Sequence, residues 1–274
     1  MYRPPWAPTE VDIALPSVAR VYDYYLGGSH NFESDRAFGR RVTDVYPALP
    51  VVLRDNRAFL RRAVRYLVAA GVDQFLDLGS GIPTVGNVHE VAHAGNPAAR
   101  ILYVDHDPVA VTHSRELLGD NPRTVVLAAD FLDPERVLHE AVEAGDLDLD
   151  RPVAVLALLI LHFVADERQP GEIMARYLRA TAPGSYLAIS QSRSDGSPEA
   201  VAGQRLYARE RSLEEMHPRT ATAATAVTAL FGDLTLLAPG VVAAPAWRPE
   251  PAASDEEPDV PDDHPVLAGV ARKD

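Results

Sequence analysis

The stretch FLDLGSGIPT, residues 75–84, decides the fold of this 274-residue chain. Its first four residues suit a buried strand, and Gly79 and Gly81 follow at once. Glycine adopts positive φ easily and, lacking a Cβ, lets a ligand approach the backbone closely. Pro83 suits the first position of a helix, which is predicted over residues 84–94. The stretch therefore predicts a strand, a tight turn and a helix, although a turn of this kind can also be purely structural.

From residue 74 onward, apolar runs typical of strands alternate with helical patterns along the chain. Strands are predicted over residues 74–78, 101–104, 124–128, 152–159, 185–190, 234–237 and 266–271. Helices are predicted over residues 84–94, 108–118, 134–144, 171–181, 198–212 and 220–231. The first five strands are continuously apolar, which is typical of parallel strands covered on both faces. The pattern predicts an α/β, Rossmann-like sheet that is mostly parallel, with its last strand antiparallel.

The N-terminal part of the chain is predicted to be helical. Ser17 is suited to cap a helix over residues 17–26, where apolar and aromatic residues recur at helical spacing. A short helix is predicted from Ser34 to a point before Pro47, and a longer one over residues 53–70.

These patterns divide the chain into two parts. Residues 1–70 are expected to form a helical extension and lid, and residues 71–274 a Rossmann-like domain. Within that domain the acidic, proline-rich stretch 245–263 has no periodicity and is interpreted as a surface loop.

Carboxylates follow the second and third predicted strands. Asp105 ends the second strand, where it can accept hydrogen bonds from both hydroxyls of a ribose. Asp107, before Pro108, is better suited to cap the next helix. Asp130 follows the third strand and can accept from the amine of an adenine, with Phe131 against the base; capping of the following helix is the alternative for Asp130. Ligands of open α/β sheets bind at these strand ends.

The residue at position 84 helps to distinguish a dinucleotide ligand from a nucleoside ligand. A dinucleotide-binding turn needs a third glycine there, so that the helix can pack closely beside a pyrophosphate. This chain has Thr84. The turn therefore favours a nucleoside without a phosphate over a dinucleotide.

These residues resemble the class I S-adenosylmethionine-dependent methyltransferases. The resemblance extends to one family of unassigned substrate, known chiefly from actinobacteria, and covers nearly the whole chain. The stretches that carry it are PSVARVYDYYLGGSHNFESDR (16–36), NRAFLRRAVRYL (56–67), QFLDLGSGIPTVGNVHEVA (74–92), LYVDHDP (102–108), RPVAVLALLILHFVAD (151–166), PGSYLAIS (183–190) and APGVVAAPAWRP (238–249). The family implies a seven-stranded methyltransferase sheet and S-adenosylmethionine as the methyl donor, with S-adenosylhomocysteine as the product.

The resemblance also implies roles for individual residues. The methionine and ribose end of the donor would be lined by Asp77, Gly79, Ser80 and Gly81. The ribose and adenine would be met by Asp105 and His106, and the adenine by Asp130 and Phe131.

Three residues are candidates for the methyl-acceptor side. Tyr22 and Tyr25 lie in the predicted lid, residues 17–36, where their rings can stabilise a sulfonium by cation–π contact. His162 follows the fourth strand and can orient or deprotonate an acceptor. The alternatives are that both tyrosines pack in the core at helical spacing and that His162 packs at the sheet edge. Arg57 could meet a carboxylate, but it is interpreted as a helix-surface residue.

Composition limits the chemistry and the partners. The chain has no cysteine, which excludes disulfides and thiolate catalysis, and its histidines show no metal-ligand spacing. A net charge of −13 without any basic block makes nucleic acid an unexpected partner. Without a signal peptide or a bilayer-length apolar run, a cytoplasmic protein acting on a small molecule is expected, with no membrane contact.

Two alternatives to a methyltransferase remain at this point. One is a non-catalytic S-adenosylmethionine-binding regulatory protein. The other is an NAD(P)-dependent oxidoreductase, against which Thr84 and Asp130 argue.

Overall fold

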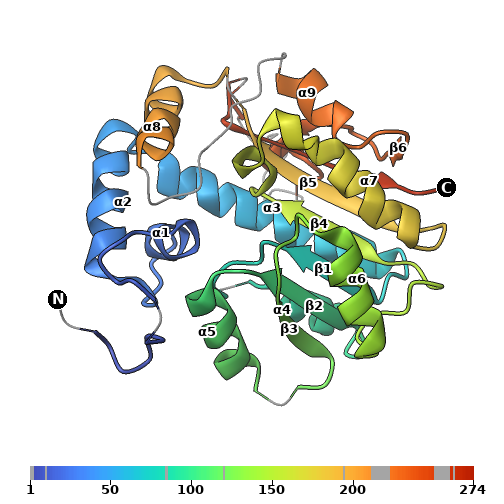
Figure 1. Cartoon of the computed structure of the whole chain (residues 1–274). Coiled ribbons are helices and arrows are strands. Elements are labelled where there is room, and N and C mark those ends of the chain that lie inside the picture. Colours follow the sequence, from blue (N-terminus) through green and yellow to red (C-terminus); the bar gives the residue numbers. More distant parts are fainter. Residues whose placement is uncertain are drawn as a thin grey trace.

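A mostly parallel sheet forms the centre of the computed structural model (Figure 1). The structure describes residues 3–9, 11–83, 86–119, 121–193, 195–210, 223–249, 260–261 and 263–274. In these ranges the strands are β1 (Gln74–Leu78), β2 (Arg100–Asp105), β3 (Thr124–Ala128), β4 (Ala154–Leu158), β5 (Tyr186–Ser192), β6 (Thr235–Leu236), β7 (Val242–Ala243) and β8 (Val266–Arg272). Their order is β3-β2-β1-β4-β5-β8-β6, and β7 also pairs with β8.

Strand directions confirm the predicted fold class. The strands from β1 to β5 are parallel, and β8 is antiparallel to β5. In the described part of the chain the sheet has eight strands rather than the expected seven, because the two-residue strand β7 is too short to leave a periodic pattern. Since β1 lies between β2 and β4, the order reverses at β1 and β4, and a crevice opens there at the carboxyl ends of the strands.

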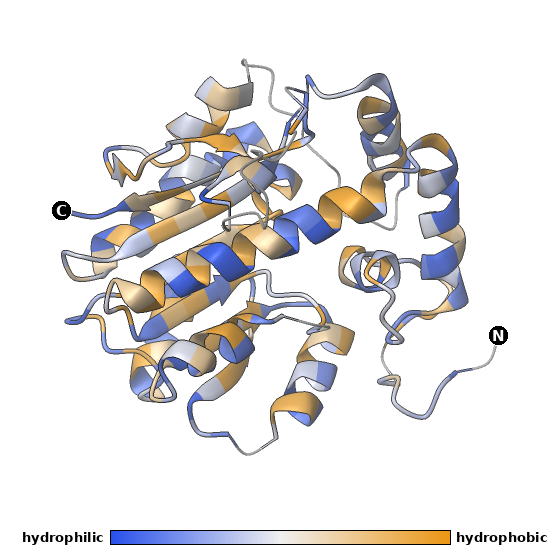
Figure 2. Cartoon of the chain, turned by 180° about the vertical axis from the view of Figure 1, so that it is seen from behind, coloured by the Kyte–Doolittle hydropathy of each residue, from blue (hydrophilic) through white to orange (hydrophobic). Residues whose placement is uncertain are grey.

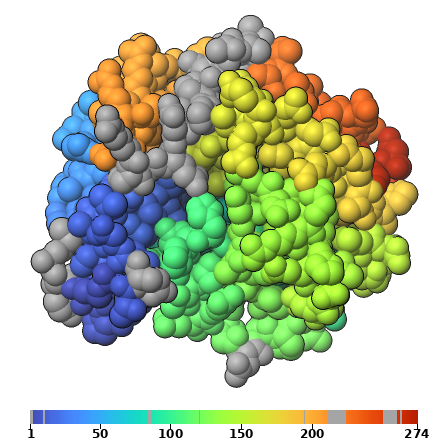
Figure 3. All heavy atoms as spheres, viewed as in Figure 1, coloured from blue at the N-terminus to red at the C-terminus, as the bar shows by residue number. Residues whose placement is uncertain are grey.

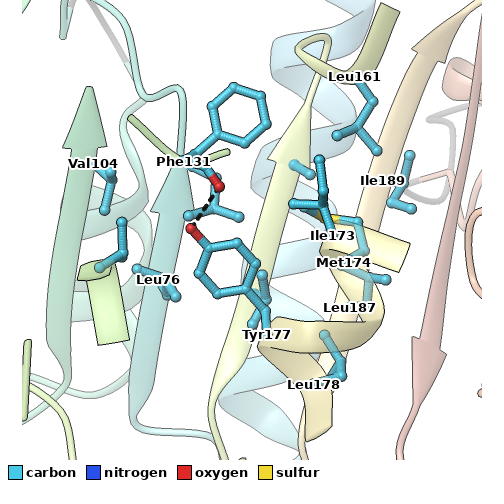
Figure 4. Packing of buried hydrophobic residues seen from close by; sticks show 14 of the residues in the cluster. Leu76, Val104, Phe131, Leu161, Ile173, Met174, Tyr177, Leu178, Leu187 and Ile189 are labelled. Atoms are coloured by element: carbon cyan, nitrogen blue, oxygen red, sulfur yellow. Dashed lines mark hydrogen bonds between the residues drawn. The ribbon is translucent and has the colours of Figure 1, made fainter. Parts of the chain in front are cut away.

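Helices cover both faces of the sheet. One face carries α3 (Leu49–Ala69), α4 (Val88–Gly95) and α5 (Pro108–Leu118); the other carries α6 (Pro134–Glu143), α7 (Pro170–Ala180) and α9 (Ala223–Ala229). Alternate side chains of β1 point to opposite faces of the sheet: Phe75 packs toward α3, and Leu76 packs toward α6 and α7. Figure 4 shows the second face, where the Tyr177 hydroxyl on α7 donates to the Phe131 carbonyl at 2.8 Å. Single-turn helices occur at η1 (Leu161–Phe163), η2 (Asp166–Arg168) and η3 (Ala244–Ala246).

The N-terminal helices stand at the carboxyl ends of the strands. They are α1 (Val18–Tyr25) and α2 (Glu33–Val45), beside which lies α8 (Pro198–Arg209) (Figure 1). Figure 2 shows α3 crossing the back of the sheet and reaching these helices with its N-terminal end. In Figure 3 the blue N-terminal residues lie against the green atoms of α5. The helical extension is thus packed onto the sheet domain, and its function as a lid stays a prediction.

The helix after the glycine turn begins later than predicted. It starts at Val88 rather than at residue 84, so Pro83 is not its first residue. The backbone N–H of Asn87 donates to the Glu90 carboxylate at 2.8 Å, which fixes the helix start there. Thr84, on which the choice between nucleoside and dinucleotide depended, lies outside the described residues.

The predicted acidic surface loop also begins differently. Trp247 lies within residues 245–263 but is fully buried, with its ring edge-on to Phe59. The Arg62 side chain donates to the Trp247 carbonyl at 2.9 Å, so the start of this stretch packs against α3. Residues 250–259 and 262 lie outside the described ranges.

None of the helices that the structure describes combines the length and the apolar character needed to cross a bilayer.

Candidate functional site

A cavity of about 210 Å³ opens at the carboxyl ends of β1, β2 and β4, beneath α1. We call it the strand-end cavity. It brings together seven residues that the sequence singled out: Tyr22, Asp77, Gly79, Ser80, Gly81, Asp105 and His106. Separate parts of the chain thus meet at the predicted crevice. The residues from β1 and β2 meet because parallel strands end at the same edge of the sheet, and Tyr22 reaches them from α1.

The glycine turn forms the floor of this cavity. Gly79 and Gly81 have φ values of +64° and +65°, which favour glycine. A Cβ on Gly79 would lie 2.6 Å from Ile160, whereas a Cβ on Gly81 would meet nothing within 4 Å. Gly79 is therefore needed for packing as well as for φ, and Gly81 faces open space. Beside them the Ser80 hydroxyl is buried and has no hydrogen-bond partner in the described structure, as expected where a polar ligand binds.

Asp105 holds the turn in place. Its Oδ2 accepts from the Gly81 backbone N–H at 2.7 Å, and its Oδ1 accepts from the Asp107 N–H at 2.8 Å. Burial raises the pKa of Asp105, and these two backbone donors oppose that rise. Each oxygen of an ionised carboxylate can accept a further hydrogen bond. Asp105 can therefore organise the turn and still receive ligand hydroxyls.

Asp77 is a buried carboxyl on the wall of the same cavity. Burial raises its pKa to about 7; the charge of Arg57 lowers it and that of Asp105 raises it. Arg57 comes from α3, lines the cavity and donates to Asn87 Oδ1 at 2.8 Å. The helix-surface interpretation of Arg57 was therefore wrong, because α3 turns this residue toward the strand ends.

Asn56 is a cavity residue that sequence reasoning missed. It is buried on α3, where its Nδ2 donates to the Tyr22 hydroxyl at 3.3 Å and its Oδ1 accepts from Ser190 Oγ at 2.6 Å. It thereby ties α1 to β5. One signal in the sequence could have identified Asn56: it lies in the apolar stripe of a long helix, between Leu53 and Phe59. A polar side chain buried in such a stripe needs hydrogen-bond partners.

A buried ion pair fastens α1 over the cavity. Asp35 accepts from Arg20 Nε at 3.0 Å and from the backbone N–H groups of Ser17 at 2.9 Å and Phe32 at 2.7 Å. Ser17 Oγ donates to Asp107 at 2.6 Å. The other Asp107 oxygen accepts from the first backbone N–H groups of α5, which confirms its predicted capping role. The N-terminal helices are thus anchored to the turn after β2.

Asp130 and Phe131 are not among the residues that line the strand-end cavity. Asp130 is exposed and accepts from the Leu132 backbone N–H at 2.9 Å. Phe131 is 5% exposed and belongs to the core shown in Figure 4. Their contact with an adenine stays a prediction.

A second cavity of about 100 Å³ lies between α1, α2, α3 and α8. We call it the helical cavity. Tyr25 and His162 line it, and Tyr22 borders both cavities together with Val18 and Leu159. His162 is 6% exposed on η1, with its ring 4.2 Å from that of Phe163. The three candidates for the acceptor side therefore meet at this one place.

The tyrosines around the helical cavity are neutral. Burial raises the pKa of Tyr22, Tyr25 and Tyr207 above the usual 10.0. The Tyr207 hydroxyl donates to the Tyr25 hydroxyl at 3.3 Å. Tyr25 also packs with Val21 and Phe38, so it is a core residue as well. These hydroxyls can orient a ligand, but they are poor bases at neutral pH.

No group of three or more histidine, aspartate or glutamate side chains with the geometry of a metal site occurs in the part of the chain that the structure describes.

Comparison with known proteins agrees with this arrangement. The profile of a family described as S-adenosyl methyltransferase matches residues 4–274. A crystal structure from Thermobifida fusca, of a protein assigned as a methyltransferase, is 38% identical, with a TM-score of 0.89 over 98% of this chain and 99% of that one. A DUF574 family protein from Streptomyces avermitilis is also 38% identical, with a TM-score of 0.86 over 96% and 100% of the two chains.

A shorter match links the chain to a curated protein. Ribosomal RNA small subunit methyltransferase H from Halorhodospira halophila is 35% identical over 63 residues. That match spans 23% of this chain and 19% of the relative.

Proposed function

Because the chain belongs to the S-adenosyl methyltransferase family, we propose that it binds S-adenosylmethionine in the strand-end cavity and methylates a small-molecule acceptor. The observation that carries this proposal is the meeting of the glycine turn, Asp77 and Asp105 in one cavity. The bound donor would supply a methyl group on a sulfonium, from which a neutral thioether departs as a good leaving group. The protein's own residues have to bind, align and exclude water.

The lining of the strand-end cavity suits an adenosyl sulfonium with an amino-acid end. The Asp105 oxygens, each holding one backbone donor, have lone pairs left for the two ribose hydroxyls. Asp77 would face the ammonium group of the methionine end, which favours the ionised carboxylate. The unpartnered Ser80 hydroxyl and the open side of Gly81 fit a polar ligand lying along the turn.

Alignment is the main contribution that these residues make to the rate. Holding donor and acceptor in line can remove about 7–11 kcal/mol of the barrier. The Tyr22 ring, fixed through Asn56, borders the place where the two cavities meet. There it would shield the sulfonium from water and stabilise it by cation–π contact.

A small-molecule acceptor agrees with the charge and shape of the protein. The net charge of −13 opposes approach to a nucleic-acid backbone, and α1 lies over the strand-end cavity. The 19% coverage of the ribosomal RNA methyltransferase is too short to carry an RNA acceptor over to this chain.

Calorimetry with S-adenosylhomocysteine and with NAD tests the proposal. We expect S-adenosylhomocysteine to bind at a single site and NAD not to bind; binding of NAD alone would contradict the proposal. Methyl incorporation into a metabolite extract of molecules below protein size then tests catalysis. Binding without any incorporation would favour the non-catalytic regulatory alternative.

A further inference from the structure

The two cavities differ in charge. The strand-end cavity is lined by the charged side chains of Arg57, Asp77, Asp105 and Asp107 and by the imidazole of His106. Among the described residues that line the helical cavity there is no aspartate, glutamate, lysine or arginine. His162 is the one lining group there whose ordinary pKa lies near neutrality. Charged and neutral binding surfaces are thus separated, with Tyr22 between them.

From this separation we propose that the helical cavity takes an uncharged, largely apolar acceptor of one or two rings that presents a hydroxyl group to the strand-end cavity. The inference rests on the proposed function, since it names the acceptor of the same reaction. It extends that function by assigning the acceptor a place and a chemical class.

Desolvation decides against a charged acceptor. A carboxylate or an ammonium entering the helical cavity would lose its hydration and meet no aspartate, glutamate, lysine or arginine among the described lining residues, which disfavours its burial there. Most of the lining is aliphatic or aromatic, from residues such as Val42, Leu53 and Val266. Such a surface gains free energy by covering apolar rings.

Four polar side chains that line this cavity form two hydrogen-bonded pairs. The Tyr25 and Tyr207 hydroxyls share a hydrogen bond, and Gln204 Nε2 donates to Ser192 Oγ at 2.8 Å. Each hydroxyl oxygen can accept one more bond. A neutral hydroxyl can therefore join these pairs without leaving a buried charge uncompensated.

The size of the cavity limits the acceptor. Since a site needs at least about 10–15 Å³ to hold one water, 100 Å³ has room for several waters or for a small ring system. The shared border residues Val18, Tyr22 and Leu159 make the two cavities neighbours. A hydroxyl at that border would point at the methyl group.

The reaction transfers a methyl group from the sulfonium sulfur to the acceptor oxygen. The acceptor oxygen forms a C–O bond as the C–S bond breaks, and the sulfonium becomes a neutral thioether. The hydroxyl proton is finally lost to water, with the His162 imidazole as the proposed carrier among the lining groups, so no further reactant is needed.

Three ring-matched probes test the inference by binding, independently of turnover. They are 2-naphthol, 2-naphthoic acid and 2-(aminomethyl)naphthalene, each titrated at neutral pH into protein saturated with S-adenosylhomocysteine. We expect 2-naphthol to bind at least tenfold more tightly than either charged probe. Equal or tighter binding of a charged probe, or no binding of 2-naphthol, would overturn the inference.

A cavity-filling variant locates the site. Ala200 on α8 is buried and lines the helical cavity, whereas Ala208 on the same helix is exposed. Ala200→Leu should weaken 2-naphthol binding at least tenfold, while Ala208→Leu leaves it unchanged. Unaltered 2-naphthol binding by Ala200→Leu would place the probe elsewhere and contradict the inference. The affinity for S-adenosylhomocysteine, measured in every variant, reports folding and tests the proposed function separately.

Discussion

The Asp105 carboxylate accepts a hydrogen bond from the Gly81 backbone N–H at 2.7 Å, which joins the end of β2 to the turn after β1. One side chain therefore shapes the turn and also faces the cavity. This double role explains why an acidic residue at this strand end is coupled to a glycine-rich turn. It also means that a substitution of Asp105 affects the turn and the ligand together.

The first prediction concerns Asp105. Asp105→Ala removes both backbone contacts and the proposed ribose contacts, so the affinity for S-adenosylhomocysteine should fall at least tenfold, or about 1.4 kcal/mol. Calorimetry measures the affinity. Asp150→Ala is the control, because Asp150 is exposed and precedes β4, at the opposite edge of the sheet. Unchanged affinity in Asp105→Ala would show that the second-strand carboxylate is misassigned.

The second prediction concerns the pH dependence of binding. Burial raises the pKa of Asp77 to about 7 in the ligand-free protein. An ammonium group bound beside it would favour the ionised form, so affinity should rise as the pH increases from 6 to 8 and protons should be released on binding. Calorimetry in buffers of different ionisation enthalpy counts those protons. In Asp77→Asn both effects should disappear; if they persist, another group titrates.

The same raised pKa affects stability without ligand. The folded-state pKa of Asp77 lies above the usual 3.8, so its contribution to stability is fully present below about pH 4 and is lost as the pH rises through 7. Urea unfolding of the wild type and of Asp77→Asn at pH 5 and pH 8 checks this sign. The wild type should lose more stability than the variant between the two pH values.

The third prediction concerns the link between α1 and β5. Asn56→Ala leaves the buried Ser190 hydroxyl without its acceptor, which should lower the free energy of unfolding by about 1–3 kcal/mol. Tyr22→Phe removes the longer, 3.3 Å contact but keeps the Asn56–Ser190 bond, so it should cost less than Asn56→Ala, which loses both contacts. Chemical denaturation of both variants measures the difference. Equal losses of unfolding free energy in the two variants would mean that the Asn56–Ser190 hydrogen bond does not add to the stability of the protein.

The fourth prediction compares two neighbouring glycines after α1. A Cβ on Gly28 would lie 1.9 Å from Asp23 Oδ1, while Gly27 has φ +81° and nothing within 4 Å of its Cβ position. Gly28→Ala should cost about 1–3 kcal/mol by overpacking, and Gly27→Ala about 1–2 kcal/mol by backbone strain. Gly28→Ala should also speed hydrogen exchange in residues 29–31, because Asp23 accepts from the His30 N–H and from the Asn31 side chain. Slow exchange there would contradict the packing argument.

The fifth prediction concerns two stacked histidines that join the N-terminal extension to α5. The rings of His30 and His113 lie 3.3 Å apart between centroids, and burial, followed by the charge of His30, lowers the pKa of His113 from the usual 6.5. The stability that this contact contributes should be present above pH 6.5 and be lost as the pH falls below it. Denaturation of wild type and His113→Phe between pH 5 and 7.5 tests this sign. A variant that loses as much stability as the wild type on acidification would exclude this histidine.

The parallel core was predictable because its signals are local. Continuous apolar runs and capping residues placed β1 to β5 within about two residues of their observed bounds. The start of α4 was misplaced, since the Asn87–Glu90 interaction outweighs the preference of Pro83 for a first turn. Strand β7 has only two residues and depends on pairing with β8, which sequence periodicity does not record.

The site was predictable in part for the same reason. Residues at or just beyond the carboxyl ends of strands, such as Asp77, Gly81 and Asp105, reach the cavity because these ends meet at one edge of the sheet. Asn56 was missed and Arg57 was assigned to the helix surface, because their place depends on how α3 turns against the sheet. The helical cavity depends on packing between α1, α2 and α8, and no motif marks such a contact between distant segments.

The most direct measurement is a crystal structure of the protein with S-adenosylhomocysteine. We expect the nucleoside in the strand-end cavity, its ribose hydroxyls within hydrogen-bond distance of Asp105 and its sulfur next to Tyr22, facing the helical cavity. A nucleoside bound away from the turn at residues 79–81, or density that leaves this cavity empty at saturating ligand, would contradict the account.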